Sequence, residues 1–297
     1  MTAQMDIPAA TPEAWSSPTK PVRALSWGKA ATVTVIFVGC IVFMLPLIVI
    51  LMTALRSQVD LIQRGPATVP HQIDLGNFSA AWTGGTLGDF YRNTVLILVV
   101  KVPLGILIAS LAAYPIAFMR FRGRKLLFVI LLVGLAIPQV ITLFPLLQIT
   151  RVMGVQNTVW ILLLPYIAFG LPFAILVMRA AFRGVPQELL EAARMDRASE
   201  LYIWWRICMP LVLPALASLA ILDGVATWNE FVIALALISN QQNYTLPLGI
   251  FNLQGQFSSN YPQMAAGVII CVLPMILLFL IARKYLTQGV AAGGLKG

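Results

Sequence analysis

Apolar residues form six long runs along this chain, with shorter polar stretches between them. A helix needs about 20 apolar residues to cross a hydrocarbon core about 30 Å thick, and it satisfies its backbone hydrogen bonds internally. The pattern therefore predicts an all-α membrane protein with six transmembrane helices, at about residues 30–55, 94–118, 126–149, 159–181, 211–238 and 265–282.

The composition supports this class, because 59% of the residues are hydrophobic, only 10% are charged and the mean hydropathy is +0.87. Such values are typical of lipid-facing surface rather than of a soluble core. The first run is too long for the apolar region of a signal peptide and no small-residue cleavage site follows it, so we expect it to remain as a helix.

Lysine and arginine are divided unequally between the two sides of the membrane. Loops on the cytoplasmic side carry the excess of positive charge. One side has fifteen of the 20 cations, the other has Arg56, Arg64, Arg92 and Arg151, and Lys101 lies within a span. We therefore expect a multi-pass protein of the plasma or inner membrane with both termini in the cytoplasm. This topology also explains the net charge of +9, which does not then indicate nucleic-acid binding.

The segments outside the runs give the expected domain organisation. Residues 1–29 contain four prolines and little to bury, which predicts a disordered cytoplasmic tail. The prolines and glycines of residues 56–89 predict a compact, turn-rich extracytoplasmic loop. Five spans then form a core at residues 90–283, which includes a polar loop at 183–209, and residues 284–297 form a cytoplasmic tail.

The chain shows no set of residues suited to bond chemistry. His71 is the only histidine, which removes histidine-based triads and histidine metal clusters. There is no GxxxxGK[ST] phosphate-binding loop, and Cys40, Cys208 and Cys271 share no metal-ligand spacing. We therefore expect a transport component rather than an enzyme, with no metal or cofactor bound by this chain. Its energy would come from an ion gradient or from another subunit.

The segment at 186–214 is densely charged and amphipathic, unlike the rest of the chain. Its start predicts a short helix in which Leu189, Ala192 and Ala193 form a narrow apolar stripe. Ser199 is suited to cap a second helix. A simple amphipathic anchor would have the same pattern. Two such helices at the membrane surface would expose Glu191, Arg194, Asp196 and Arg197.

The order of the residues in this segment is more specific than its amphipathic pattern. EAARMDRA at 191–198, followed by Ile207 and Pro210, resembles the EAA loop of type I (MetI-like) ABC importer permeases. The resemblance covers most of the chain from about residue 30, and it points to the smaller permease subunit of maltose-type carbohydrate importers. The other matching pieces are Arg92, Asn93 and Thr94, AAYPIAFMRFRGR at 112–124, FRGVPQELLEAA at 182–193, WNEF at 228–231, TLPLG at 245–249 and GVAAGGLKG at 289–297.

The resemblance implies a permease in which residues 90–283 are the transmembrane core and the EAA loop couples transport to a separate ATPase. It implies four partners: a dimer of ATPase subunits that bind ATP and Mg, a second homologous permease, an extracytoplasmic solute-binding protein and a sugar. A further ATPase contact is implied at Leu295, Lys296 and Gly297. The coupling residues would be Glu191, Ala192, Ala193, Asp196, Arg197 and Ala198.

One position departs from the family pattern, because Arg197 stands where a glycine usually follows the aspartate. Glycine permits a left-handed turn between the two helices, and other residues adopt that conformation at a cost of order 1–2 kcal/mol. The sequence predicts that either the turn has another shape or Arg197 makes a new contact.

Three charged residues within the spans require an explanation, because a charge at a helix centre costs roughly 2.5–3.5 kcal/mol on insertion scales. Asp223 and Glu230 are seven residues apart, so they share a helix face that should turn inward. With Asn229 they are candidates for lining a translocation pathway. For Asp223 and Lys101 a structural clamp between helices is the favoured explanation, and for Glu230 the two explanations are balanced.

Two other functions remain open at this point. A proton-coupled secondary transporter could use Glu230 and Asp223, but it would need internal repeats and no partner subunit. A passive membrane anchor would explain the EAA segment but not the acidic helix face. The sequence identifies neither the sugar nor whether this subunit contacts it.

Overall fold

The computed structural model describes residues 27–66, 68–84, 86–256 and 260–294 of the 297-residue chain, and these contain helices and no strand. The chain divides into two units, Met1–Leu47 and Ile48–Gly297. The described part of the first unit belongs to α1 (Trp27–Ala54), which continues into the second. Side chains of α1 between residues 31 and 47 are almost all exposed and apolar, as expected of a helix that faces lipid.

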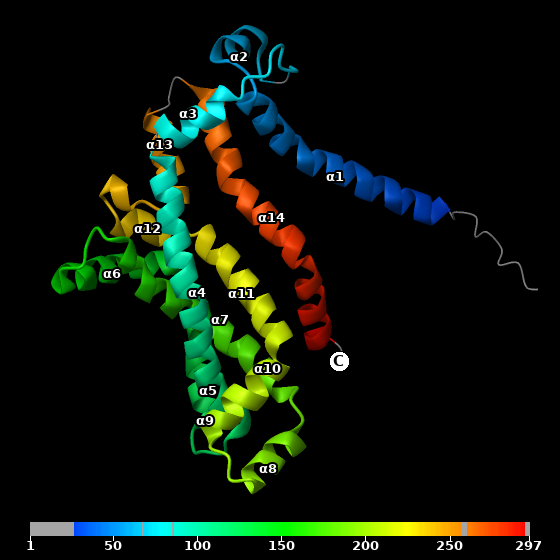
Figure 1. Cartoon of the computed structure of the whole chain (residues 1–297), viewed down its shortest axis with the longest axis vertical. Helices are drawn as coiled ribbons and strands as arrows, with labels where there is room; N and C mark the ends of the chain where they lie inside the picture. The colour runs from blue at the N-terminus through cyan, green and yellow to red at the C-terminus, as the bar shows by residue number, and fades with distance from the viewer. Residues whose placement is uncertain (1–26, 67, 85, 257–259, 295–297) are drawn as a thin grey trace, which may run out of the picture. The chain divides into compact units, whose positions relative to one another are not determined.

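The second unit contains most of the helices (Figure 1). In chain order the α-helices are α2 (Gln58–Arg64), α3 (Gly76–Gly84), α4 (Leu87–Phe118), α5 (Arg124–Val133), α6 (Gln139–Met153), α7 (Leu163–Arg183), α8 (Gln187–Met195), α9 (Glu200–Tyr202), α10 (Met209–Leu211), α11 (Leu213–Trp228), α12 (Val232–Leu237), α13 (Leu246–Gln256) and α14 (Tyr261–Gly294). Short helical turns of other types are η1 (Gly134–Ala136), η2 (Val159–Leu162), η3 (Ile203–Cys208) and η4 (Gln241–Asn243).

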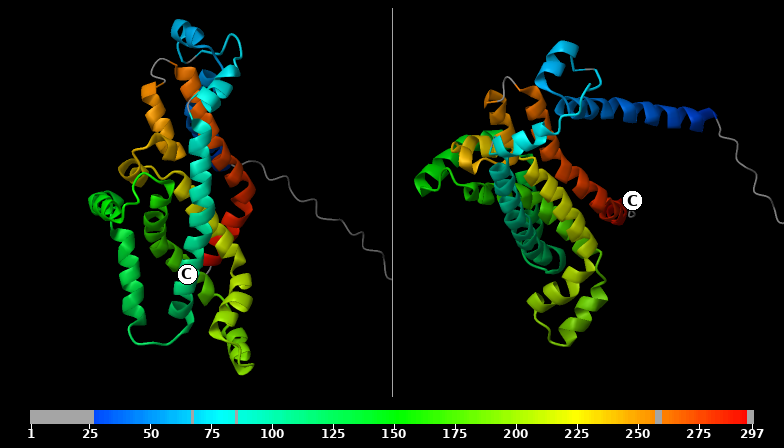
Figure 2. Two further views of the ribbon diagram at one scale, coloured as in Figure 1. Left: turned by 60° about the vertical axis from the view of Figure 1, so that its left-hand side comes forward. Right: turned by 45° about the horizontal axis from the view of Figure 1, so that its top comes forward.

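The candidate membrane spans agree in part with the six apolar runs. Four helices in the described residues are long and apolar enough to cross a bilayer, namely Ala31–Ala54, Leu87–Phe118, Val159–Arg183 and Tyr261–Ile281. Two bent pairs raise the number to as many as six: Arg124–Ala136 with Gln139–Met153, at 97°, and Glu200–Leu211 with Leu213–Trp228, at 79°. Figure 2 shows α6 turning away from α5 at the first bend.

Proline explains where these helices break. Pro138 lies just before α6, and Pro214 lies in the first turn of α11, where its missing N–H needs no partner. The fifth expected span, at 211–238, is not continuous, because α11 ends at Trp228 and α12 begins only at Val232. The helical stretch from 200 to 228 is instead bent near Val212.

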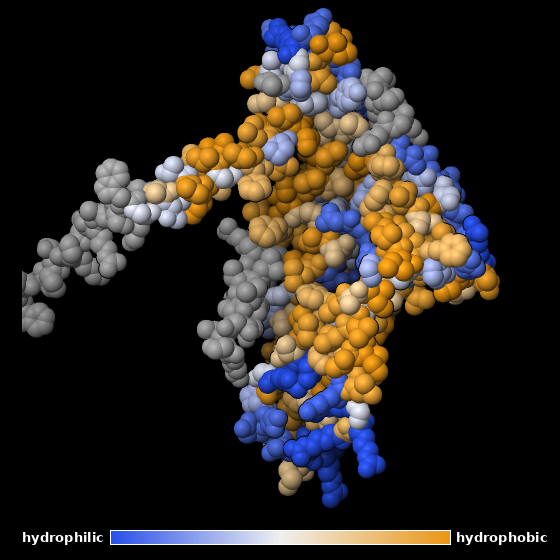
Figure 3. All heavy atoms as spheres, turned by 180° about the vertical axis from the view of Figure 1, so that it is seen from behind, coloured by the Kyte–Doolittle hydropathy of each residue, from blue (hydrophilic) through white to orange (hydrophobic). Residues whose placement is uncertain are grey.

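The interior of the second unit contains two clusters of buried apolar residues. One surrounds Phe90, Trp228 and Leu246, and involves α3, α4, η2, the start of α7, the end of α11 and the helices α12 to α14. The other surrounds Tyr114, Phe182 and Ile203, where α4 and α7 meet the EAA loop, as we call residues 183–209. On the face shown in Figure 3, hydrophobic residues cover much of the middle of the molecule, and hydrophilic residues are densest at the lower end.

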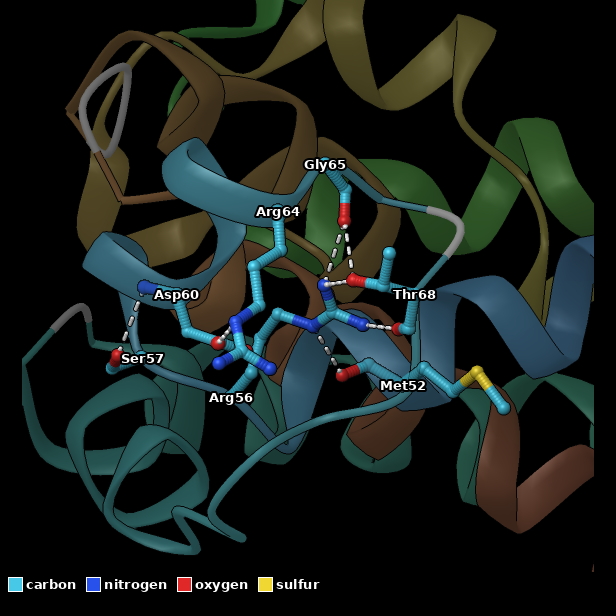
Figure 4. A network of polar contacts seen from close by, with 7 residues as sticks. All are labelled: Met52, Arg56, Ser57, Asp60, Arg64, Gly65 and Thr68. Atoms are coloured by element: carbon cyan, nitrogen blue, oxygen red, sulfur yellow. Dashed lines mark hydrogen bonds and ion pairs between the residues drawn. The ribbon is translucent and has the colours of Figure 1, made fainter.

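The extracytoplasmic loop expected at 56–89 contains α2 and α3 and is built around Arg56 (Figure 4). The Arg56 side chain is fully buried, and it donates to the carbonyl oxygens of Met52, at 3.2 Å, Gly65, at 2.8 Å, and Thr68. Ser57 caps α2 by accepting from the N–H of Asp60. The buried cation therefore draws its stabilisation from backbone oxygens and organises the loop around itself.

Candidate functional site

The first helix of the EAA loop presents one face to the protein and most of its charge to solvent. Leu190 and Ala193 are the buried residues of α8. Leu189 and Ala192, which were expected to share the apolar stripe with Ala193, are exposed, because the buried face is one residue further along the helix. The other residues predicted for coupling lie together on this loop: Glu191, Asp196 and Arg197 are exposed, and Ala198 is half-buried.

The turn after α8 keeps a left-handed geometry although it contains no glycine. Arg197 has a φ of 58°, within the left-handed region. Around it, the N–H of Asp196 bonds to Ala192 O at 3.1 Å and the N–H of Ala198 bonds to Ala193 O at 3.0 Å, which closes the end of α8. Of the two alternatives that the sequence left open, a turn of another shape is therefore wrong, because the turn is left-handed at the cost of strain at Arg197.

The second helix begins as predicted, with Ser199 accepting from the N–H of Tyr202 at 3.3 Å. Glu200, the next residue, connects the loop to two other elements. It accepts from Arg194 Nε of α8 at 2.8 Å and from the Tyr114 hydroxyl of α4 at 2.6 Å. The hydrogen bond between the two side chains raises the pKa of the Arg194 guanidinium and lowers the pKa of the Glu200 carboxyl, which favours the charged form of both.

Aromatic rings pack against Tyr114, which bonds to Glu200. Tyr114 packs edge-on against Phe118 and Phe182, with ring centroids 5.3 Å and 6.0 Å away. All three rings belong to the second buried cluster or pack against it. Sequence reasoning missed Tyr114 and Glu200 as positioning residues, although Tyr114 lies within the family piece at 112–124 and Glu200 directly follows the predicted cap Ser199.

A polar cluster lies between the helices of the spans. Lys101 of α4 forms an ion pair with Asp223 of α11, and both side chains are largely buried. Gly170 of α7 makes room for the pair, since a Cβ there would lie 3.1 Å from Lys101 Nζ and 3.2 Å from Asp223 Oδ1. The ion pair that a structural clamp between Lys101 and Asp223 requires is therefore present.

Glu230 lies in the same cluster and has a positioning role of its own. Its carboxylate accepts from the Tyr166 hydroxyl of α7, and also from the N–H groups of Ile233, at 2.7 Å, and Ala234, at 3.3 Å. The last two are unpaired donors in the first turn of α12, so Glu230 caps that helix. The break between α11 and α12 thus contains a half-buried carboxylate that caps the second of the two helices.

A cavity of about 260 Å³ is lined by Lys101, Tyr166, Asp223 and Glu230 together with apolar residues of α7 and α11. Asp223 and Glu230 therefore line the same cavity, but not through the single helix face that their spacing predicted, because α11 ends at Trp228, before Glu230. Asn229, the third candidate pathway residue, does not line this cavity. It is exposed, and its amide bonds to Val225 O one turn back at 2.9 Å.

Two family pieces that are distant in sequence, Arg92–Thr94 and TLPLG at 245–249, meet near the N-terminal end of α4. The Asn93 amide donates to Gln242 O at 2.8 Å and Tyr244 O at 3.1 Å, and Thr94 Oγ1 accepts from the N–H of Leu246 at 2.7 Å. These bonds hold the start of α13, which carries the TLPLG piece, against α4. The candidate C-terminal contact at Leu295, Lys296 and Gly297 lies outside the described residues.

Comparison with known proteins identifies the family. Residues 102–291 match the family of binding-protein-dependent transport system inner membrane components. The chain belongs to this family. The match covers more than half of the sequence and includes the EAA loop together with Tyr166, Asp223 and Glu230 of the polar cluster, and it begins one residue after Lys101.

Relatives of this permease align over nearly their whole length. It is 32% identical to the arabinooligosaccharides transport system permease protein AraQ of Halalkalibacterium halodurans, over 92% of this chain and 97% of the relative. It is also 32% identical to the melibiose/raffinose/stachyose import permease protein MelC of Bacillus subtilis, over 91% and 97%.

A solved structure supports the same fold. A chain of a bacterial ABC transporter involved in the import of the acidic polysaccharide alginate matches with a TM-score of 0.74 at 22% identity, over 90% of this permease and 99% of that chain. The fold class expected from the sequence, an all-α permease of the MetI-like type, is therefore confirmed.

Proposed function

We propose that this permease is a subunit of an ATP-driven carbohydrate importer and that its EAA loop docks on a separate ATPase. The observation that carries the proposal is the geometry of Glu191, Asp196 and Arg197. They are exposed on a short helix and its turn, which Arg194, Glu200 and Tyr114 fasten to the end of α4. A movement imposed on α8 would thus be passed directly to a helix that contributes Lys101 to the polar cluster.

The carbohydrate substrate is proposed from the relatives, whose names specify arabinooligosaccharides and melibiose, raffinose and stachyose. The remaining partners follow the same reasoning: two ATPase subunits that bind ATP and Mg, a second permease, and a solute-binding protein on the outer face. A related transporter structure contains a periplasmic protein bound to an alginate pentasaccharide. Both termini would lie in the cytoplasm, with α2 and α3 on the opposite side from α8, at the other end of the second unit (Figure 1).

Within the spans we assign Asp223 and Glu230 to the wall of the translocation pathway and Asn229 to its margin. The hydroxyl and carboxylate groups around the cavity could hydrogen-bond to the hydroxyls of a sugar. The competing proton-coupled transporter would require Glu230 to gain and lose a proton during transport. In the structure the Glu230 carboxylate instead accepts from the N–H groups of Ile233 and Ala234, an arrangement that suits a positioning role at the start of α12.

The test of docking is co-purification from membranes in mild detergent. Glu191→Lys should lose the ATPase but retain the second permease, because it reverses one exposed charge and leaves the buried face of α8 intact. Glu188→Lys is the matched control, since Glu188 is exposed on the same helix, and it should retain both partners. Recovery of the chain alone in every variant would overturn the importer proposal in favour of the proton-coupled transporter.

The role of Glu230 is tested separately by sugar uptake in cells. Glu230→Gln keeps the shape of the side chain and its oxygen acceptor but removes its charge. If Glu230 lines the pathway, uptake should fall while assembly with the ATPase remains. Unchanged uptake would remove Glu230 from the pathway and leave it with a purely structural role.

A further inference from the structure

A groove of about 640 Å³ lies between the connection from α4 to α5 and the beginning of the EAA loop. Its wall contains one acid and four arginines: Glu191, Arg120, Arg124, Arg183 and Arg194. Arg194 is paired with Glu200, but among the described residues no carboxylate forms an ion pair with the other three arginines. The groove therefore has an excess of positive charge that the described chain leaves unpaired.

The positive charge extends behind the groove wall. Arg179, one turn before Arg183 on α7, lies over the ring of Phe128 of α5, with its guanidinium carbon 3.7 Å from the ring centroid. Its Nε atom is buried and has no hydrogen-bond partner. Arg124 and Arg183 are close enough to interact with it electrostatically. Like charges held this closely destabilise each other unless an anion joins them.

The surface next to the groove is apolar and is shaped like a lipid-facing helix. Arg124 is the first residue of α5, and the outward face of that helix continues with Leu126, Val129, Ile130 and Val133, spaced by three or four residues. Each of these four side chains is more than half exposed. A ligand with a phosphate in the groove could lay an acyl chain along this face.

From the arginine groove and its apolar continuation, we propose that this site binds the phosphate group of an anionic phospholipid of the cytoplasmic leaflet. The proposal rests on the orientation given under Proposed function. Basic pockets between spans on that side favour anionic headgroups, because arginine binds phosphate through two parallel hydrogen bonds and the leaflet supplies the negative charge. A bound lipid would lie beside Glu191, so the lipid and the ATPase would contact adjoining surfaces of α8.

The experiment is native mass spectrometry of the full-length chain in detergent, titrated with dioleoyl phosphatidylglycerol or dioleoyl phosphatidylcholine. We expect the first phosphatidylglycerol to bind about 100-fold more tightly than phosphatidylcholine. Arg120→Gln with Arg124→Gln should weaken phosphatidylglycerol binding about 30-fold, and Arg183→Gln alone, on a different element, about fivefold.

The matched control is Arg122→Gln with Lys125→Gln. It removes the same charge from the same connection, but neither residue lines the groove. Binding in the control should weaken less than threefold. Equal weakening in both double variants would show attraction to charge in general and would overturn the proposal.

Two further measurements separate the lipid from other anions and from a protein occupant. Inorganic phosphate and sn-glycerol 3-phosphate should each compete with phosphatidylglycerol only at concentrations at least 100-fold higher. Competition at equal concentration would identify a site for a free anion instead. Loss of the lipid when the ATPase is bound would assign the groove to that subunit. Because lipid binding is measured on the chain alone, its failure leaves the importer proposal untouched.

Discussion

At the scale of single residues, the strain at Arg197 shows that this loop keeps a conformation for which its residue is poorly suited. The sequence predicted the conflict at this position, and the structure resolves it in favour of the left-handed turn. Partners of the buried charges could not be predicted in the same way. Asp223 and Glu230 line the same cavity, as expected of residues that turn inward, but Lys101 and Tyr166 come from other helices at sequence separations of 122 and 64 residues.

Replacing Arg197 with glycine should stabilise the EAA loop by about 1 kcal/mol, because glycine adopts a positive φ without strain. Hydrogen exchange should then show roughly fivefold more protection of the loop amides. Asp196→Gly is the matched control. Asp196 has a φ of −76° and gains nothing from glycine, so protection should fall or stay the same. A gain in both variants would contradict the assignment of strain to Arg197.

Gly249 is a position where a neighbouring ring leaves no room for a side chain. A Cβ there would overlap ring carbons of Phe90. The Phe90 side chain is fully buried, so little space is left for it to move aside. Gly249→Ala should therefore destabilise the chain by about 1–3 kcal/mol, in the range measured for overpacked cores.

The measurement for Gly249→Ala is thermal unfolding followed by size-exclusion chromatography. Gly224→Ala is the control, since Gly224 lies within α11 and a Cβ there would meet no atom within 4 Å. That control should be neutral or slightly stabilising, because alanine is the better helix former. A similar loss in both variants would contradict a local clash at Phe90.

At the scale of elements, the apolar runs predicted most of the helices but not their bends. A hydropathy window sums side chains and is insensitive to direction, so a helix that turns by 97° between Ala136 and Gln139 gives the same signal as a straight one. The attachment of α8 to α4 was also not predictable, because it depends on Glu200 accepting from both Tyr114 of α4 and Arg194 of α8.

Tyr114→Phe should loosen the EAA loop from α4. It removes one hydrogen bond to a charged carboxylate, which is worth about 1.5–3 kcal/mol, while the aromatic packing against Phe182 is kept. Amides of residues 194–202 should exchange about tenfold faster. Tyr202→Phe, at an exposed position on the same loop, should leave exchange within twofold of the wild type. Equal effects would mean that Tyr114 does not hold the loop.

At the scale of the whole molecule, the ion pair of Lys101 with Asp223 joins helices that are far apart in the sequence. A buried charge that loses its partner is costly, at roughly 3–5 kcal/mol, whereas replacing both charges by apolar residues is often neutral or stabilising. Lys101→Met should therefore destabilise the permease strongly.

Lys101→Met combined with Asp223→Leu should restore most of that stability, and melting of the purified complex measures both effects. Sugar uptake in the double variant then separates two roles for the pair. Uptake that recovers together with stability would make the pair a clamp. Uptake that stays absent in a stable complex would place Asp223 on the pathway. A double variant less stable than Lys101→Met would contradict the pairing itself.

The same ion pair constrains the order in which the helices can reach their final positions during biosynthesis. A ribosome adds about 5–20 residues per second, so the 122 residues that separate Lys101 from Asp223 take roughly 6–24 seconds to synthesise. During that interval α4 has left the ribosome with a lysine near its middle and no counter-ion. A long lysine side chain can extend to the membrane–water interface. Until α11 is made, α4 can therefore remain near that interface or beside the insertion machinery. Its final place in the bilayer becomes available only when α11 arrives with the missing carboxylate.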